Sequence, residues 1–386
     1  MKNFIILVLD GVGVGELPDA SQYNDAGSNT LGNMGNKLGG LNLPNLEKMG
    51  LGNIIPIKGV KEAANPIASF GKMNEQSKGK DSTSGHWEIG GVIVDQEFPL
   101  YPDGFPKEII DKFMAEAKVE GILGNKPASG TEIIKELGEE HVKSGYPIVY
   151  TSGDSVFQIA AHEEVIPLER LYEICKAARH KVMTGKDAVG RIIARPFIGR
   201  PGSFTRTTNR KDFSVDPFGD TILDLFTSEG IKTYGIGKIN DLFNYRGIQY
   251  RLHTKSNSEG IDTIINTVKS TGSSLIFANL VDFDVYYGHR LDPEGYHKAL
   301  MEFDERLPEI LNALDDTDRL VITSDHGNDP TTNSTDHSRE YVPLLFYGRE
   351  LTGRNLGVRE TFADVAQTAC HFFNINNTLA GTGFLA

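Results

Sequence analysis

Acidic and histidine side chains follow short apolar segments at several places in this 386-residue chain. Three such segments, residues 4–9, 274–281 and 320–323, each end within two residues of an aspartate. Continuous apolar runs of this length are typical of strands that are buried on both faces of a parallel sheet. Because parallel strands present their carboxyl ends at one edge, we expect the side chains that follow them to lie together. In chain order these are Asp10, Asp282, Asp284, His289, Asp325, His326 and His337.

The group offers carboxylate oxygens and imidazole nitrogens and contains no thiolate. Such a set suits hard or borderline divalent cations such as Mn²⁺, Mg²⁺ or Zn²⁺. It has enough members for two ions, which typically lie ~4 Å apart and hold the attacking and leaving oxygens of a phosphoryl group. A single aspartate after a strand is more simply a turn or helix cap. The recurrence of the pattern along the chain is what predicts a two-metal site.

Residues 79–88, GKDSTSGHWE, contain three consecutive hydroxyl side chains between two glycines. This segment is suited to begin a helix, and a helix N-terminus favours bound anions. A metal ion would lower the pKa of a hydroxyl group at that place and make it a nucleophile. A capping cluster in a Gly-rich turn explains the same residues equally well. We interpret His86 in this segment as a packing residue beside the nucleophile.

Amphipathic helix patterns separate the apolar segments, at residues 259–269, at 297–314 and from Thr361 onward. Alternating strands and helices predict an α/β fold with a mostly parallel central sheet flanked by helices. The middle of the chain differs, because Pro-rich turns at 98–106 and 214–220 bound it.

The bounded segment has helix patterns at 107–118 and 168–180 and a strand candidate at 148–150. We therefore expect a discontinuous core of residues 1–97 and 217–386, with an inserted smaller α/β domain of residues 98–216.

A net charge of −13 argues against a nucleic-acid partner, because a phosphate backbone needs a basic surface. The apolar run near the N-terminus has only six residues, which is too short for a signal peptide or a membrane span. The two cysteines form no CxxC motif or disulfide framework. We expect a cytoplasmic protein with a small-molecule substrate, and no obligatory protein partner is evident.

Several segments of the chain, from the first apolar run to the last helix, resemble the phosphopentomutase family, a branch of the alkaline phosphatase superfamily. They are LDGVGVGELPDA, GKDSTSGHWE, GNKPASGTEII (124–134), AAHEEVIPLERLYEIC (160–175), GRIIARPF (190–197), NLVDFDVYYGHR (279–290), SDHGNDPTTNSTDHSREYVPLL (324–345) and TFADVAQT. The resemblance implies an alkaline-phosphatase-like core and metal-dependent phosphoryl transfer. The segments from the middle of the chain are specific to this branch.

The resemblance also implies a role for each member of the group. Asp10, Asp325 and His326 would hold one ion, with Mn²⁺ as the metal that the resemblance implies. Asp284, His289 and His337 would hold the other.

Ser82 would be the phosphorylated nucleophile that bridges both ions, at a position where the family has threonine. Serine lacks only a methyl group and is the nucleophile elsewhere in the superfamily, so we expect function to be retained. Thr83 and Ser84 are its neighbours, and the choice of Ser82 depends on the alignment.

The inserted domain is implied to be a cap that closes over the sugar and excludes water. Ser152, Asp154 and Val156 match the family's sugar-contacting segment, with Asp154 accepting hydrogen bonds from ribose hydroxyls. Arg191 would face the distal phosphate, and Ile193 would pack on the sugar. Lys238, from the core, would be a further cation near the phosphate.

The implied reaction interconverts ribose 1-phosphate and ribose 5-phosphate, and the 2-deoxyribose equivalents, through a bisphosphate intermediate, with a sugar bisphosphate as activator. A metal-dependent phosphohydrolase on the same core is the nearest alternative. A non-catalytic binding protein on that fold is another, although no metal ligand is missing from the sequence.

Overall fold

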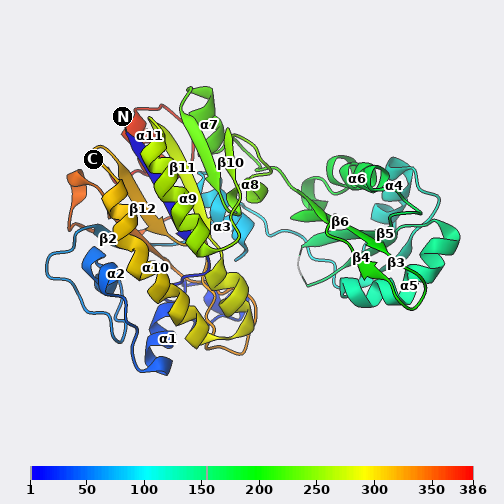
Figure 1. Cartoon of the computed structure of the whole chain (residues 1–386), viewed down its shortest axis with the longest axis horizontal. Helices are drawn as coiled ribbons and strands as arrows, with labels where there is room; N and C mark the ends of the chain where they lie inside the picture. The colour runs from blue at the N-terminus through cyan, green and yellow to red at the C-terminus, as the bar shows by residue number, and fades with distance from the viewer. Residues whose placement is uncertain (1, 154, 386) are drawn as a thin grey trace. The chain divides into compact units, whose positions relative to one another are not determined.

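The computed structural model describes residues 2–153 and 155–385. The chain divides into two compact units (Figure 1). The larger consists of residues 1–96 and 217–386, and the smaller consists of residues 97–216. The interpretation of the smaller unit as a substrate-binding cap stays a prediction.

An eight-stranded sheet forms the centre of the larger unit. Only β13 runs antiparallel to its neighbours among the paired strands described in this sheet. This confirms the α/β fold with a mostly parallel sheet. In spatial order the strands are β10 (Tyr250–Leu252), β9 (Lys232–Ile236), β11 (Ser274–Leu280), β1 (Asn3–Leu9), β12 (Arg319–Thr323), β13 (Val342–Tyr347), β2 (Ser69–Met73) and β14 (Asn355–Arg359).

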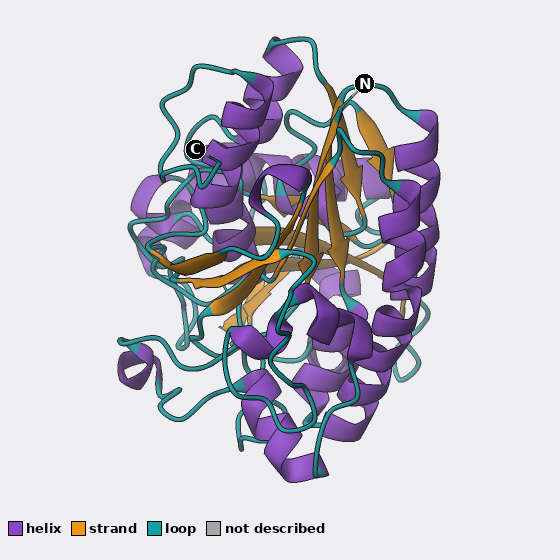
Figure 2. Ribbon diagram, turned by 90° about the vertical axis from the view of Figure 1, so that its left-hand side faces the viewer, coloured by secondary structure: helices purple, strands orange, loops and turns teal. Residues whose placement is uncertain are grey.

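Helices pack against both faces of this sheet (Figure 2). On one face, Ile5, Leu7 and Leu9 of β1 share a hydrophobic cluster with α1 (Thr30–Leu38), α2 (Pro44–Met49), α9 (Asn257–Ser270) and α10 (Pro293–Ala313). On the other face lie α3 (Ser82–Ile89), α7 (Ile222–Ser228), α8 (Ile239–Leu242) and α11 (Asp364–Phe373). There the ring of Phe4 lies 5.8 Å from that of Phe372 in α11.

The last helix begins three residues later than the sequence pattern predicts, at Asp364 rather than at Thr361. The cause is the buried carboxylate of Glu88 in α3, which accepts hydrogen bonds from the Thr361 hydroxyl at 2.6 Å and from the Phe362 backbone N–H at 3.0 Å. These bonds hold the two residues in a turn that joins α11 to α3, the helix that carries the predicted nucleophile.

The smaller unit has its own six-stranded sheet, in the order β3-β4-β5-β6-β7 with β8 also paired to β6. Helices α4 (Lys107–Ala117) and α6 (Leu168–Ala177) pack on one face, and α5 (Gly130–Ser144) packs on the other. The sequence patterns predict α4, α6 and β4 but none of the other strands. The strands are β3 (Leu123–Pro127), β4 (Ile148–Thr151), β5 (Val156–His162), β6 (Arg191–Ile198), β7 (Thr205–Arg206) and β8 (Lys211–Ser214).

Candidate active site

Three parallel strands of the larger sheet deliver three aspartates to one edge. Strand β1 lies between β11 and β12 and is parallel to both. Asp10 directly follows β1, Asp325 follows β12, and Asp284 lies in a short helical turn, Phe283–Tyr287, after β11. All three carboxylates are buried. The structure thus brings together the acidic residues that the strand ends predict, with the exception of Asp282, which accepts a hydrogen bond from the Asn257 N–H in α9.

Asp10, Asp325 and His326 form one group whose ligand atoms all lie within 4.8 Å of one another. His326 Nε2 lies 3.4 Å from Asp10 Oδ1 and 3.2 Å from Asp325 Oδ2. These two buried oxygens accept no hydrogen bond from any residue that the structure describes. Leaving buried carboxylate oxygens without a donor is unfavourable unless a cation binds them. The donor set therefore fits a divalent metal ion.

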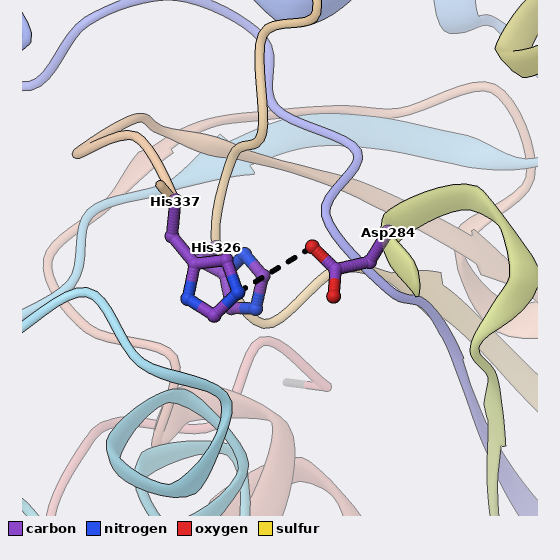
Figure 3. Close-up of side chains that lie close together, drawn as sticks. All are labelled: Asp284, His326 and His337. Carbon is purple, nitrogen blue, oxygen red and sulfur yellow. Dashed lines mark ion pairs between the residues drawn. The ribbon is translucent and has the colours of Figure 1, made fainter. Parts of the chain in front are cut away.

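Asp284, His326 and His337 form a second group within the same 4.8 Å limit (Figure 3). His289 belongs to the same neighbourhood, because its Nε2 lies 3.2 Å from Asp284 Oδ2 and 3.2 Å from His337 Nε2. The imidazole of His326, which the family resemblance assigns to the first ion only, stacks on that of His337 at 3.7 Å between ring centroids. All six predicted side-chain ligands from Asp and His thus gather here, while their division between two ions stays a prediction.

The three histidines share one orientation. In each, Nδ1 lies within hydrogen-bond distance of a backbone carbonyl: Thr335 for His289, Gly327 for His326 and Lys80 for His337, at 2.7, 3.0 and 2.9 Å. A carbonyl can only accept, so Nδ1 carries a proton in each ring, and Nε2 is the nitrogen that can bind a cation when the ring is neutral. In each case Nε2 is the atom that approaches the carboxylates. A carbonyl on the far nitrogen is the usual way in which proteins orient a metal-binding imidazole.

The buried aspartates need compensating positive charge at this edge of the sheet. Burial and the neighbouring Asp325 raise the pKa of Asp10. Burial also acts to raise the pKa of Asp284, but His337 and His289 hold it well below its usual range. Burial acts to lower the pKa of His326, but Asp325 raises it to about 10. Imidazolium groups thus compensate carboxylates here, and a divalent cation would do so more strongly.

Ser82 is the hydroxyl of the Gly-rich segment that faces this group. It is the first residue of α3, whose N-cap residue Asp81 accepts hydrogen bonds from the N–H groups of Thr83 and Ser84. Ser82 Oγ lies 3.2 Å from His326 Nε2 and accepts a hydrogen bond from Lys238 Nζ at 3.0 Å. The Ser84 hydroxyl instead donates to the Asp81 carboxylate at 2.9 Å. The positions of the two hydroxyl groups therefore distinguish Ser82 from Ser84, whereas the residue types alone do not.

Close packing fixes this position of α3. A Cβ atom on Gly85 would lie 2.1 Å from the backbone oxygen of Asp325, so only glycine allows the helix to approach the end of β12.

His86 and Asn279 are site residues that the sequence interpretation missed. His86 Nδ1 lies 3.1 Å from Asp325 Oδ2 and 2.8 Å from the Ser82 carbonyl oxygen. Asn279 Nδ2 donates to Asp10 Oδ2 at 2.9 Å and lies 3.0 Å from His86 Nε2. Both side chains are buried. His86 is therefore more than a packing residue, and its place one helical turn after Ser82 was the available signal.

The predicted sugar-contacting residues lie in the smaller unit, except for Lys238. Val156 is paired with Arg191 at the start of β5 and β6, and Ile193 follows on β6. Arg191 forms an ion pair of 3.6 Å with Asp212. Ser152 directly follows β4, so it lies at the same end of the sheet. Asp154 lies outside the described residues.

A model of the metalloenzyme superfamily matches residues 2–377, so the chain belongs to a class of metal-dependent enzymes. Full-length relatives named phosphopentomutase share more than half of its residues. That of Dictyoglomus thermophilum is 59% identical over 100% of this chain and 98% of its own length. That of Caldanaerobacter subterraneus subsp. tengcongensis is 58% identical over the same shares. The chain therefore belongs to the phosphopentomutase family and is a mutase of the isomerase class, as the sequence motifs predict.

Solved structures with similar folds are far more distant in sequence. The PH0037 protein from Pyrococcus horikoshii has a TM-score of 0.49 and 12% identity over 98% of both chains. A Leishmania mexicana phosphoglycerate mutase has a TM-score of 0.46 and 11% identity, over 98% of this chain and 97% of its own.

Replacing Asn279 by Ala is expected to weaken Mn²⁺ binding about 10- to 100-fold, because outer partners of metal ligands contribute that much to affinity. The substitution removes the hydrogen bonds that orient Asp10 and His86. Asn240→Ala is the matched control, since Asn240 is also a buried asparagine but donates to backbone carbonyls of Gly235 and Gly237. Titration calorimetry with Mn²⁺ measures both, and equal affinities in the two variants would show that Asn279 does not position the ligands.

Chelation of divalent metals is expected to lower the melting temperature of the wild type, because an ion that binds only the folded state stabilises it by about 2.7 kcal/mol at 100 times its Kd. Asp10→Asn should abolish most of this difference. It should also leave the metal-free protein as stable as the wild type or more stable, because burial already disfavours the charged form of Asp10.

Asp95→Asn serves as the control in this experiment, because Asp95 is exposed and lies in the same unit. Scanning calorimetry with and without Mn²⁺ is the measurement. A metal-induced rise in melting temperature that is the same in Asp10→Asn as in Asp95→Asn would exclude Asp10 as a ligand.

Proposed function

We propose that this enzyme interconverts the 1-phosphates and 5-phosphates of ribose and 2-deoxyribose through a phosphorylated Ser82. The observation that carries the proposal is the position of the Ser82 hydroxyl, within 3.2 Å of His326 and 3.0 Å of Lys238, beside two overlapping groups of candidate metal ligands. The name of the full-length relatives supports the substrate class.

In the proposed cycle, Ser82 starts as a phosphate monoester. The free hydroxyl of the bound pentose monophosphate attacks phosphorus, and the bond from phosphorus to Ser82 Oγ breaks. The products are a pentose 1,5-bisphosphate and a Ser82 hydroxyl, which takes up the proton that the attacking hydroxyl loses. Attack by Ser82 on the other phosphate then releases the isomeric monophosphate and restores the phosphorylated enzyme. Atoms balance over the two steps, and no water is consumed.

The residues of the chain contribute charge and orientation. Ser82 is the first residue of α3, so a phosphate on its hydroxyl would lie at the positive end of the helix dipole. Lys238 Nζ donates to Ser82 Oγ, so its charge stabilises negative charge on that oxygen when the bond to phosphorus breaks. Asp10 lies 3.6 Å from the same ammonium group and keeps it in place.

The proposed metal ligands are the six Asp and His residues of the site, with Ser82 Oγ as a seventh. Asp10, Asp325 and His326 would hold one ion, and Asp284, His289 and His337 the other. When bound, two divalent cations neutralise the transferring phosphoryl group and hold it in line. We propose Mn²⁺ as the physiological ion, and a sugar bisphosphate as the activator that phosphorylates an enzyme that has lost its phosphate to water.

The smaller unit is proposed to bind the pentose phosphate. Ser152, Val156, Arg191 and Ile193 are the described residues that we assign to this role, together with Asp154. Arg191 offers the planar donor arrangement that matches a phosphate group.

The partner of this enzyme is proposed to be its small-molecule substrate alone. No helix within residues 2–153 or 155–385 has the length and apolar character that a membrane span requires. The cytoplasmic location inferred from the sequence, and the absence of nucleic-acid and protein partners, stay predictions.

Ser82→Ala is expected to reduce the conversion of ribose 5-phosphate to ribose 1-phosphate to less than about one-thousandth of the wild-type rate, as for loss of a covalent nucleophile. The assay contains Mn²⁺ and a trace of sugar bisphosphate and follows ribose 1-phosphate and free phosphate together. Ser84→Ala is the control, because its hydroxyl caps α3 through Asp81 and does not face the candidate metal ligands.

Two results would contradict the proposal. Ribose 1-phosphate formation that survives in Ser82→Ala would exclude Ser82 as the phosphorylated residue. Free phosphate as the main product of the wild type would make the chain a phosphohydrolase.

A further inference from the structure

A cavity of about 550 Å³ in the smaller unit is lined by three arginines and by no acidic residue. Arg195 comes from β6, Arg206 from β7, and Arg210 from the segment before β8. The antiparallel pairing of β7 with β6 brings the first two together, with Phe197 opposite Arg206. Ile134 and Phe204 add an apolar wall.

The positive charge in this cavity is only partly compensated. Arg210 forms two hydrogen bonds with the Asp212 carboxylate, at 2.8 and 2.7 Å. Arg195 donates to the neutral amide oxygen of Gln158 at 2.9 Å. Arg206 is solvent-exposed, and none of the residues that the structure describes forms an ion pair with it. Burial lowers the pKa of Arg195, Tyr150 acts against this shift, and the like charges of Arg210 and Arg206 add to it.

Two further features of the cavity point to an anion. Thr131, in the first turn of the 15-residue helix α5, lines it, so the helix N-terminus is directed toward it. The hydroxyl group of Tyr150 is buried and has no hydrogen-bond partner among the described residues. A Cβ atom on Gly130 would lie 2.7 Å from this hydroxyl and 3.5 Å from Arg206 Nη1, so both groups meet at the start of α5. Tyr150 is not one of the residues that line the cavity, but its unpartnered buried hydroxyl near Arg206 costs free energy without a ligand.

We propose that this cavity is a binding site for the phosphate group of a sugar phosphate, additional to Arg191 and Lys238. Guanidinium groups match phosphate in bidentate geometry, and an apolar wall suits a sugar ring. The volume falls in the range of small-molecule sites and exceeds what one phosphate group needs. The choice of a sugar phosphate rests on the proposed function, whereas the anion site rests on the cavity alone.

Arg206→Gln tests the site, and Arg200→Gln is the matched control because Arg200 is an exposed arginine of the same unit that does not line the cavity. Both changes are made in full-length Ser82→Ala protein with Mn²⁺, which cannot turn over. Titration calorimetry then measures binding of inorganic phosphate, ribose 5-phosphate and a hexose 1,6-bisphosphate. Loss of one charged hydrogen bond is expected to weaken binding at least about 10-fold in Arg206→Gln. Arg200→Gln should change it less than about 2-fold.

The kinetics of the same substitutions with Ser82 intact identify the source of the phosphate. A raised KM for ribose 5-phosphate assigns the cavity to the substrate. A raised bisphosphate concentration for half-activation, with KM unchanged, assigns it to the activator. Both results support the site. Equal affinities of Arg206→Gln and Arg200→Gln for all three ligands, at equal melting temperatures, would overturn the proposed site. A wild type without mutase activity would refute the proposed function but leave the binding comparison valid.

Discussion

Repulsion among three buried carboxylates is the constraint on which the larger unit depends. Asp10, Asp284 and Asp325 converge because the parallel strands β1, β11 and β12 end at one edge of a sheet, and that sheet is held by apolar packing on both faces. Taking several carboxylates out of water costs several kcal/mol for each unless positive charge accompanies them. The carboxylates are surrounded by groups that can offset their negative charge. These are the imidazoles, the ammonium group of Lys238 and the outer donors Asn279 and His86.

The proposed nucleophile, Ser82, is positioned through the same arrangement. Helix α3 contacts the end of β12 at Gly85, and Glu88 connects it to the start of α11. Ser82 and His86 lie one turn apart on α3, so one helix brings a hydroxyl to His326 and an imidazole to Asp325. Close packing of α3 at Gly85 fixes where both side chains start, which favours the pre-organisation that phosphoryl transfer requires.

The sequence predicts the parts of the site that depend on strand ends. Asp10 and Asp325 follow apolar runs that form parallel strands. Because those strands end at the same edge of the sheet, the two residues lie close together. His86 and Asn279 could not be predicted in the same way, because one lies within a helix and the other within an apolar strand, where burial hides their polar contacts. In the smaller unit, β6 contains Arg191, Arg195 and Pro196, which obscure its strand pattern. The arginine cavity arises from antiparallel pairing between β6 and β7, and nothing in the spacing of its arginines indicates that contact.

The smaller unit is inserted between β1 and the strands that pair with it, so β1 is synthesised long before its partners. Strand β1 pairs with β11 and β12, and its Asn3 lies opposite Ser274. Translation at ~5–20 residues per second separates these strands by roughly 14 to 54 s. Meanwhile the smaller unit, whose paired strands lie between Leu123 and Ser214, already has all the partners described for them. The apolar segment Phe4–Leu9 therefore lacks its native strand partners during that time, and exposed apolar segments of this kind are prone to aggregate.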